Sequence, residues 1–309
     1  MNENQIIQWL MEGDVSVQYQ ASRDLLGDDR KNLRRRIAVE GWGQRFLSKR
    51  KQNGHWGDRF YQPKWTSTHY TLLDLRNLNL DPENRAVHRT IEMVIDNGKA
   101  DDGGIPLGPS TSKHSDICVN GMFLNYASYF NTKRERLQSV VDSILSQVML
   151  DGGFNCNSNT AGARHSSVHS TLSVLEGITE YQKNGSNYRL KELAVAKKSS
   201  IEFLLKHQLY LSDKTGEIIN KDFLKLTYPS RWRYDVLRAL DYLQHAGISY
   251  DRRIESAIDV LHRKRNKDNT WNMQAKHPGK VHFEMEKAGA PSRWNTLRAM
   301  RVLKHFKST

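Results

Sequence analysis

Three residues of the types that zinc prefers stand at the starts of predicted helices. Asp116 and Cys118 form an Asp-x-Cys pair after a Gly103-Gly104 turn, and His169 follows a second turn at Gly152-Gly153. Zinc binds thiolate, imidazole and carboxylate groups, and a catalytic site commonly keeps three protein ligands and one open position. A helix N-terminus stabilises a thiolate through its free N–H groups and its dipole. The sequence therefore predicts a Zn²⁺ site made of Asp116, Cys118 and His169.

A second ligand set is available in the same region. Cys156 lies in the turn before the next helix and His165 begins that helix, so Cys118, Cys156 and His165 form an alternative triad. The metal-free alternative is that Cys118 is a small core residue and the histidines are polar caps. Two cysteines in 309 residues make no disulfide framework, and no disulfide is expected.

Three histidines are candidates for proton transfer. His114, His165 and His282 are predicted to be catalytic, because imidazole titrates near neutral pH. Each of them is as compatible with a structural histidine whose hydrogen bonds are satisfied.

Arginine and tryptophan stand side by side in two Ser-Arg-Trp segments, at 230–232 and 292–294. Arginine at a helix start suits a carboxylate or a phosphate, and tryptophan beside it offers an apolar or cation-binding face. We therefore assign catalytic roles to Arg231 and Arg293. The predicted substrate-binding residues are Lys64, Trp65, His69, Tyr70, Trp232, Tyr234 and Trp294. The alternative is that the arginines pair with acidic neighbours and the tryptophans pack between repeats.

A unit of about fifty residues recurs along the chain and predicts the elements that position these side chains. Each unit has a Gly-rich or Trp-containing turn, a polar stretch, and a helix that opens with a capping Ser, Thr, His or Asp. These helices are apolar on most sides. They are predicted at 15–26, 64–78, 115–130, 165–182, 230–244 and 292–306.

Amphipathic helices with one charged face are predicted between them. Their ranges are 5–11, 30–50, 83–97, 133–149, 189–210 and 250–265. Six less polar helices that alternate with six amphipathic ones predict two concentric rings around a central cavity. The fold class is therefore all-α, a single (α/α)6 toroid that spans residues 1–309 as one domain, with no sheet beyond short pieces in the turns. The candidate residues at the inner-helix starts are then expected to converge on one mouth of the cavity.

Composition limits the classes of protein and partner. Lys and Arg number 47 against 34 Asp and Glu, a formal charge of +13, which indicates an anionic partner or strongly solvated outer faces. Aromatic residues make up 9% of the chain and recur throughout it, which excludes disorder as the dominant state. No apolar run reaches the roughly 18 residues that span a bilayer. Residues 1–5 lack the basic start of a signal peptide, so a cytoplasmic location is expected.

These residues resemble the (α/α)6 toroid superfamily of terpenoid cyclases and protein prenyltransferase β subunits. Gly-Gly turns followed by polar-capped helices are similar to the prenyltransferase/squalene-cyclase repeat. In prenyltransferase β subunits an Asp-x-Cys pair and a later His bind zinc, and Asp116-Ile117-Cys118 and Val168-His169-Ser170 match them in order and rough spacing. The resemblance implies an enzyme that acts on a hydrophobic, isoprenoid-like substrate, with zinc as its cofactor if it follows these subunits. A protein prenyltransferase also requires a separate partner subunit.

The chain departs from the superfamily in two motifs. The Arg-x-Asn-Lys stretch that binds diphosphate is not reproduced, and only Lys113 stands nearby. The Asp-x-Asp-Asp acid of class II cyclases is absent. A transferase or a cyclase/lyase-like activity that does not begin with that acid is therefore favoured.

Two other functions remain open. Residues 13–21 resemble the start of a HEAT-type helical repeat, and a basic helical-repeat protein can bind nucleic acid through its phosphates. This alternative ranks lower because it gives the Gly-Gly turns and the Cys and His residues no role. The third is a toroid hydrolase or lyase on an acidic sugar, in which Glu284 and Glu286 near His282 do acid–base work.

Overall fold

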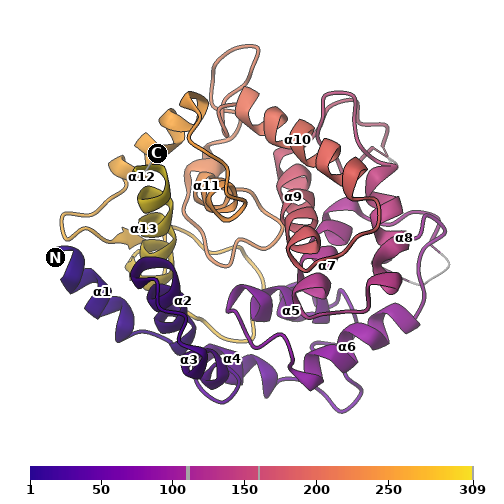
Figure 1. The fold of residues 1–309 in the computed structure, drawn as a ribbon, viewed down its shortest axis with the longest axis horizontal. Coiled ribbons are helices and arrows are strands. Elements are labelled where there is room, and N and C mark those ends of the chain that lie inside the picture. Colours follow the sequence, from indigo (N-terminus) through magenta and orange to yellow (C-terminus); the bar gives the residue numbers. More distant parts are fainter. Residues whose placement is uncertain (109–111, 159–160, 308–309) are drawn as a thin grey trace. The chain divides into compact units, whose positions relative to one another are not determined.

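The computed structural model describes residues 1–108, 112–158 and 161–307, and most of them are helical (Figure 1). The only named strands in these ranges are β1 (Trp271–Asn272) and β2 (Pro291–Ser292), which pair antiparallel. The predicted all-α class is therefore confirmed, with sheet limited to short pieces in the part of the chain described.

Helices of six to seventeen residues follow one another along the chain. In order, they are α1 (Glu3–Met11), α2 (Val15–Leu26), α3 (Lys31–Arg36), α4 (Gly41–Leu47), α5 (Thr68–Asn77), α6 (Arg85–Asp96), α7 (Ile117–Tyr129), α8 (Arg134–Leu145), α9 (Val168–Lys183), α10 (Leu190–Lys206), α11 (Val236–His245), α12 (Glu255–Arg263) and α13 (Arg293–Lys307). Short 3-10 turns occupy Lys64–Thr66, Lys221–Leu224 and Arg252–Ile254. None of the described helices combines the length and the apolar character needed to cross a membrane.

The chain packs as two compact units, each assembled from separate parts of the sequence. Unit 1 consists of Met1–Lys49, Asn77–Asp81 and Leu205–Thr309, and unit 2 of Arg50–Arg76 and Pro82–Leu204. The sequence predicts one domain over residues 1–309 and a closed ring of helices. Both predictions concern the two units together, and both stay predictions.

Unit 2 contains the alternation of buried and amphipathic helices that the sequence predicts. Every residue of α7 from Ile117 to Ser128 is buried. Helix α6 instead buries one stripe at a spacing of three and four residues, made of Val87, Thr90, Ile91, Val94 and Ile95. Helices such as α7 therefore form the interior of the unit, and helices such as α6 cover it.

Helices α7 and α9 lie side by side (Figure 1), and two glycines allow their close approach. A Cβ on Gly177 of α9 would lie 2.3 Å from the carbonyl oxygen of Gly121 on α7, and a Cβ on Gly121 would lie 2.6 Å from the carbonyl oxygen of Ser173. Both distances are far shorter than van der Waals contact, so a larger residue at either position has to move the backbones apart.

We expect Gly177→Ala to lower the free energy of unfolding. Overpacking of a tight contact costs about 1–3 kcal/mol, which exceeds the roughly 1 kcal/mol that alanine gains over glycine in a helix. Urea denaturation measures the change. Gly108→Ala is the matched control, because a Cβ there meets nothing within 4 Å. A Gly177→Ala protein as stable as the wild type would contradict the tight α7–α9 contact.

Unit 1 is organised around α13, which packs against both α2 and α11. A buried ion network joins the three helices: Asp241 of α11 binds Arg298 at 3.1 Å and Arg301 at 2.6 Å, and Arg301 reaches Asp24 of α2 at 2.9 Å. Burial raises the pKa of Asp241, but the two arginines outweigh it and hold the pKa at about 2. The carboxylate is therefore ionised at neutral pH and links the inner helices of this unit.

Several predicted helix ranges agree closely with the structure. The range 15–26 coincides with α2, and the ranges 115–130 and 292–306 differ from α7 and α13 by one or two residues at each end. Helices α5 and α9 begin a few residues after the predicted starts at 64 and 165. The caps and apolar patterns in the sequence were sufficient to place these helices.

Two predicted ranges need correction. The range 230–244 begins too early: α11 starts at Val236, because Asp235 is its cap and accepts a hydrogen bond from the Arg238 N–H, while Arg231 has a φ of 59° that no helix allows. The range 30–50 is two helices, α3 and α4. They separate before Gly41, whose φ is 60° and where a Cβ would lie 2.1 Å from a carboxylate oxygen of Asp14.

Candidate functional site

Asp116 is fixed at the start of α7 by its role as the helix cap. Its Oδ1 accepts hydrogen bonds from the N–H groups of Cys118 at 2.9 Å and Val119 at 3.2 Å. Burial raises the pKa of the Asp116 carboxyl, while these hydrogen bonds and the positive charge of Lys64 oppose the rise. The cap thus holds a partly buried carboxylate beside the first turn of α7.

Cys118 and Cys156 are joined as a disulfide, and the predicted absence of disulfides is wrong. Their Cα atoms lie 6.3 Å apart, within the usual range of about 4.4–6.8 Å. The two residues are 38 positions apart in the sequence, and the turn that leads into α9 carries Cys156 back to the start of α7. Low cysteine content gave no reason to pair them, but the fold brings both into one place.

Ser170 and Asp116 surround the sulfur pair with oxygen. The Ser170 hydroxyl lies 3.1 Å from the Sγ of Cys118 and 3.2 Å from the Sγ of Cys156, and it accepts the Cys156 N–H at 3.2 Å. The Cys156 Sγ also lies 3.1 Å from Asp116 Oδ1. The starts of α7 and α9 therefore share one polar, sulfur-containing cluster.

The donor atoms of this cluster fit a metal ion when the cysteines are reduced. One atom each from Asp116, Cys118 and Cys156 lies within 4.8 Å of the others. Two thiolates and a carboxylate are ligands that Zn²⁺ accepts at about 2.0–2.3 Å. In the disulfide form both sulfurs are oxidised and no thiolate is present. Only the reduced protein can therefore bind a metal ion through these three residues.

None of the predicted histidines belongs to this group of three. His169 is adjacent in sequence to Ser170 at the start of α9 and is half-buried. His165 is exposed, with 79% of its side chain accessible, and its Nδ1 lies 4.0 Å from Asp151. His114 is exposed in the loop before α7. The ligand role of His169 and the catalytic roles of His114 and His165 stay predictions.

An aromatic and histidine cluster lies at the start of α5. The hydroxyl groups of Tyr61 and Tyr70 are 2.9 Å apart, and the Tyr126 hydroxyl of α7 lies 3.2 Å from Nδ1 of the fully buried His69. No residue in the described ranges hydrogen-bonds to Nε2 of His69. Burial raises the pKa of Tyr61, and the negative charge of Asp116 raises it further. This link places the cluster near the sulfur pair in unit 2.

His69 is expected to make stability depend on pH. Burial lowers its pKa from 6.5 to about 3. The unfolded chain therefore binds a proton that the folded chain does not. The free energy of unfolding should fall by about 1.4 kcal/mol for each pH unit below about 6.5, until the pH reaches about 3. Between pH 7 and pH 5, the unfolding free energy should fall less in a His69→Gln protein than in the wild type. His165→Gln, which removes an exposed histidine, is the control. Equal slopes for wild type and His69→Gln would contradict this account.

The other predicted substrate-binding residues of unit 2 divide into packed and exposed groups. Tyr70 is fully buried and Trp65 nearly so, and their rings make an edge-to-face contact at 5.0 Å. Lys64 is exposed, with its Nζ 5.0 Å from the Trp65 ring. Tyr70 and Trp65 thus pack against one another, while Lys64 adds a positive charge at the edge of the cluster.

Arg231, Trp232 and Tyr234 lie in unit 1, in the loop before α11 rather than at a helix start. Arg231 is buried, and the Trp232 ring lies 5.0 Å from the guanidinium group of Arg233. The buried Tyr234 hydroxyl donates a hydrogen bond to the Leu209 carbonyl at 2.5 Å. For Tyr234 this contact is structural; the roles of Arg231 and Trp232 stay predictions.

Arg293 and Trp294 at the start of α13 also make structural contacts within unit 1. The Arg293 Nε donates to the Trp9 carbonyl at 2.8 Å, and its guanidinium lies 4.6 Å from the centre of the Trp9 ring. Trp294 is buried against Tyr228 at 4.7 Å between ring centres. These contacts anchor α13 to α1 and its neighbours, which matches the structural alternative for this Arg-Trp pair.

The acidic residues near His282 do not form a matched carboxylate pair. Glu284 binds Lys276 at 2.6 Å, whereas Glu286 accepts the N–H of Trp294 at 3.2 Å and so helps to cap α13. His282 is half-buried, with its ring 5.8 Å from Phe46. The prediction that residues of both units share one cavity mouth remains a prediction.

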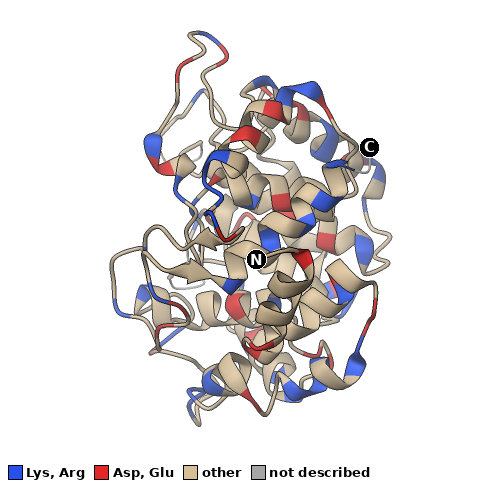
Figure 2. Cartoon of the chain, turned by 90° about the vertical axis from the view of Figure 1, so that its left-hand side faces the viewer, with Lys and Arg blue, Asp and Glu red and all other residues tan. Residues whose placement is uncertain are grey.

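Charged residues of both signs are spread over many elements of the chain (Figure 2). Lys and Arg occur on many helices and loops and are interspersed with Asp and Glu. Several basic side chains are already paired, such as Arg136 with Glu92 and Arg189 with Asp142. The basic residues are therefore divided among many elements, and some of them are paired with acidic neighbours.

Three further residues of the unit 2 site were not predicted from the sequence. Ser170 contacts the sulfurs. Tyr61 contacts Tyr70, and Tyr126 contacts His69. Ser170 directly follows His169, and Tyr61 precedes the α5 start, so proximity to the chosen motifs was the available signal. Tyr126 lies inside α7 within an apolar run, where sequence pattern indicates only core packing.

No protein-family model matches this chain, and no curated protein matches its sequence. Among solved structures, it is similar to a polysaccharide lyase at 11% identity, over 76% of this chain and 70% of that chain, with a TM-score of 0.44. It is also similar to the type II terpene cyclase MstE from Scytonema at 13% identity, over 86% of this chain and 95% of that chain, with a TM-score of 0.36. At these values, the reactions of those proteins do not carry over to this chain.

Proposed function

We propose that this protein is an enzyme of the prenyltransferase and terpenoid-cyclase type, zinc-dependent in its reduced form, that acts on a hydrophobic, isoprenoid-like substrate. The reaction is transferase or cyclase/lyase-like. The observation that carries the proposal is the meeting of Asp116, Cys118 and Cys156 at the starts of α7 and α9. Structural cysteines in a core are normally surrounded by apolar groups, whereas these sulfurs lie against a carboxylate and a hydroxyl.

Asp116, Cys118 and Cys156 would hold the ion, with His169 as the candidate for a further ligand. A bound Zn²⁺ supplies Lewis-acid chemistry and activates a thiolate or a water molecule. Ser170 would orient the two sulfurs, because its hydroxyl lies within 3.2 Å of each of them. Such outer partners fix ligand geometry and tune affinity.

The neighbouring side chains would supply proton transfer and substrate orientation. The Tyr61 hydroxyl is hydrogen-bonded to the Tyr70 hydroxyl, so a proton can pass between them. His69 stays neutral because its pKa is about 3, and a neutral imidazole can accept a hydrogen bond at Nε2. Lys64 at the exposed edge would attract an anionic group of the substrate.

The redox state links this function to the cellular compartment. Cytoplasmic thiols are kept reduced, and persistent disulfides are rare there. A cytoplasmic location, which we continue to propose, would therefore keep Cys118 and Cys156 available as ligands. A partner subunit, as protein prenyltransferases require, is part of the same proposal.

Cobalt substitution tests the proposed site. Co²⁺ added to the reduced protein should give the sulfur-to-cobalt absorption and the visible bands of a tetrahedral thiolate site. Addition of the correct hydrophobic substrate should then change the visible bands, because a catalytic ion keeps an open position. A cobalt spectrum without thiolate absorption, in protein whose free thiols have been counted, would contradict the ligand assignment.

A second candidate is a lyase that acts on an acidic sugar, and the Tyr61–Tyr70 pair favours it. Two hydrogen-bonded hydroxyls, a neutral histidine and a nearby lysine can remove a proton and bind a carboxylate without any metal. Glu284 and Glu286 are less suited to this role because each is engaged elsewhere. Formation of an unsaturated sugar, followed by ultraviolet absorption with uronic-acid polymers, would favour this candidate over the first.

A further inference from the structure

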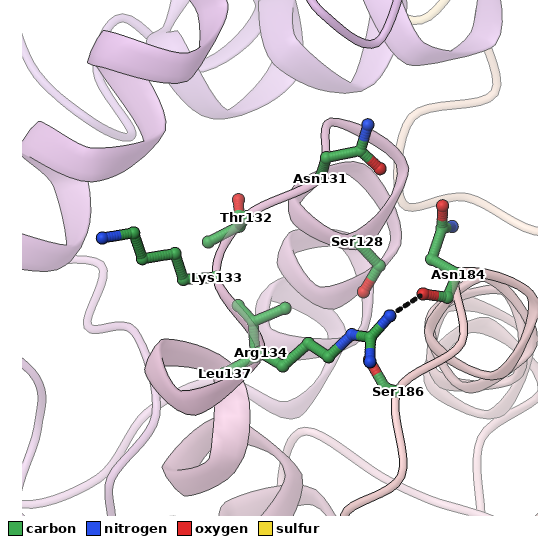
Figure 3. A pocket seen from close by; sticks show the side chains of 8 residues that line it. All are labelled: Ser128, Asn131, Thr132, Lys133, Arg134, Leu137, Asn184 and Ser186. Carbon is green, nitrogen blue, oxygen red and sulfur yellow. Dashed lines mark hydrogen bonds between the residues drawn. The ribbon is translucent and has the colours of Figure 1, made fainter.

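Unit 2 contains a cavity of about 270 Å³ between the ends of α7 and α9 and the start of α8. Figure 3 shows its lining side chains. They are Ser128, Asn131, Thr132, Lys133, Arg134, Leu137, Asn184 and Ser186. Leu137 is the only apolar residue in this set, and the other side chains carry polar or charged groups that can bind a polar ligand. Its volume lies just below the range of about 300–1,000 Å³ typical of small-molecule sites, which indicates a small ligand.

Arg134 is an exposed residue at the edge of the cavity, and its positive charge forms no salt bridge with a carboxylate of the described residues. Its one hydrogen bond in these ranges runs from Nη2 to the Asn184 carbonyl at 3.4 Å, at the weak end of the distance range (Figure 3). Gly185, with a φ of 69°, makes room for it, since a Cβ there would lie 3.2 Å from Nη2. The backbone therefore leaves a place for the guanidinium group.

Ser128 provides an independent sign of a missing partner. Ser128 is 3% exposed, and its hydroxyl group has no hydrogen-bond partner among the described residues. In Figure 3 this hydroxyl points towards the guanidinium group of Arg134. A buried hydroxyl without a partner is costly, and an acceptor oxygen bound beside Arg134 would satisfy it.

The start of α8 adds donors to the same place. No side chain caps this helix at Lys133, and its positive dipole end favours an anion, although the Arg136 N–H already donates to the Lys133 carbonyl and Glu135 adds a negative charge to the first turn. The Lys133 side chain extends away from Arg134 in the view of Figure 3 and adds charge at the rim. Asn131, also at the rim, is occupied by a hydrogen bond to Glu83.

We propose that this cavity binds a phosphate group, held by the Arg134 guanidinium, the Ser128 hydroxyl and the start of α8. A tetrahedral oxyanion has several acceptor oxygens, and it can bind a guanidinium fork, a hydroxyl and helix N–H groups together. The ligand is either free phosphate or a small phosphate ester. Asn184 and Ser186 would contact the rest of an ester.

This phosphate site is separate from the proposed zinc site. Asp116 caps the first turn of α7, whereas Ser128 stands twelve residues later near its last turn. At 1.5 Å per residue the two lie roughly 18 Å apart along the helix. The phosphate site therefore goes beyond the proposed reaction and does not depend on it.

Isothermal titration of the intact protein with inorganic phosphate and, separately, with glycerol 3-phosphate tests the proposal, at ionic strength held constant with chloride. We expect a Kd of about 1 mM or tighter for at least one of the two. Tighter binding of the ester would identify a phosphate ester as the ligand, and tighter binding of inorganic phosphate would identify the free ion. Binding of neither overturns the proposal.

Variants distinguish this cavity from general attraction to a basic protein. Arg134→Ala should raise the Kd by about 10–100-fold and Ser128→Ala by about 3–10-fold, in line with charged and neutral hydrogen bonds. Arg89→Ala removes an exposed charge outside the cavity and is the matched control, with an unchanged Kd expected. Ser128→Ala keeps the charge, so it tests the site even if the arginine variant folds poorly. Equal binding by wild type and both cavity variants, or an equal loss in Arg89→Ala, overturns the proposal.

Discussion

Replacing Cys118 or Cys156 by alanine is expected to lower the affinity of the reduced protein for Zn²⁺ by on the order of 100-fold or more. Loss of a partner in the outer shell alone costs about 10–100-fold, and a thiolate ligand contributes more than such a partner. Both substitutions should act equally, because the two sulfurs occupy one cluster with Asp116. Competition with a chromophoric zinc chelator measures the affinity.

The surrounding oxygens give graded controls for the cysteine variants. Asp116→Asn should weaken zinc binding strongly, and Ser170→Ala by about 10-fold, as expected of an outer partner. Asp101→Asn removes an exposed carboxylate from the loop before α7 and should leave the affinity unchanged. If Cys118→Ala binds zinc as tightly as the wild type, these sulfurs are not ligands and the site needs a different explanation.

Asp241→Ala is expected to cause the largest loss of stability in unit 1, about 3–5 kcal/mol. The substitution leaves Arg298, of which 6% of the side chain is exposed, without the carboxylate that it binds, while Arg301 keeps its contact with Asp24. An uncompensated buried charge costs more than the lost attraction, because it keeps its full desolvation penalty. Chemical denaturation measures the change. Asp259→Ala, at an exposed aspartate on α12, is the matched control and should change stability by less than about 0.5 kcal/mol.

The same carboxylate gives a second readout in acid. The pKa of Asp241 is about 2 in the folded protein, below its ordinary value of 3.8. Its contribution to stability is therefore complete above about pH 4 and is lost as the pH falls towards 2. The Asp241→Ala protein should lack this part of the acid dependence. An equally steep loss in the variant would mean that other carboxylates cause it.

Local signals in the sequence were sufficient where one residue fixes a helix end. Asp116 follows a Gly-Gly turn and precedes an apolar run, and it is indeed the cap of α7. Local signals were not sufficient where two residues can each cap the same helix. Ser230 and Asp235 are both good caps, and only the fold selects Asp235, because the chain between them takes a left-handed turn at Arg231.

The candidate site was predicted less completely than the helices. The repeat length brought Asp116, Cys118 and the start of α9 to the same end of unit 2, and the alternative ligand set already contained Cys156. The sequence could not indicate that Cys156 lies within bonding distance of Cys118, since this depends on the path of the turn before α9. Nor could the sequence distinguish a structural from a catalytic role for Arg293, because the structural role depends on contact with Trp9, more than 280 residues away.

Zinc content in the two redox states tests the central claim most directly. Equal samples of the intact protein are fully reduced or oxidised, their free thiols are counted, and both are dialysed against Zn²⁺ before metal analysis. The account predicts about one tightly bound ion per chain in the reduced sample and none in the oxidised one, because Cys118 and Cys156 are then joined. Equal zinc in both samples, or none in the reduced sample, would contradict it.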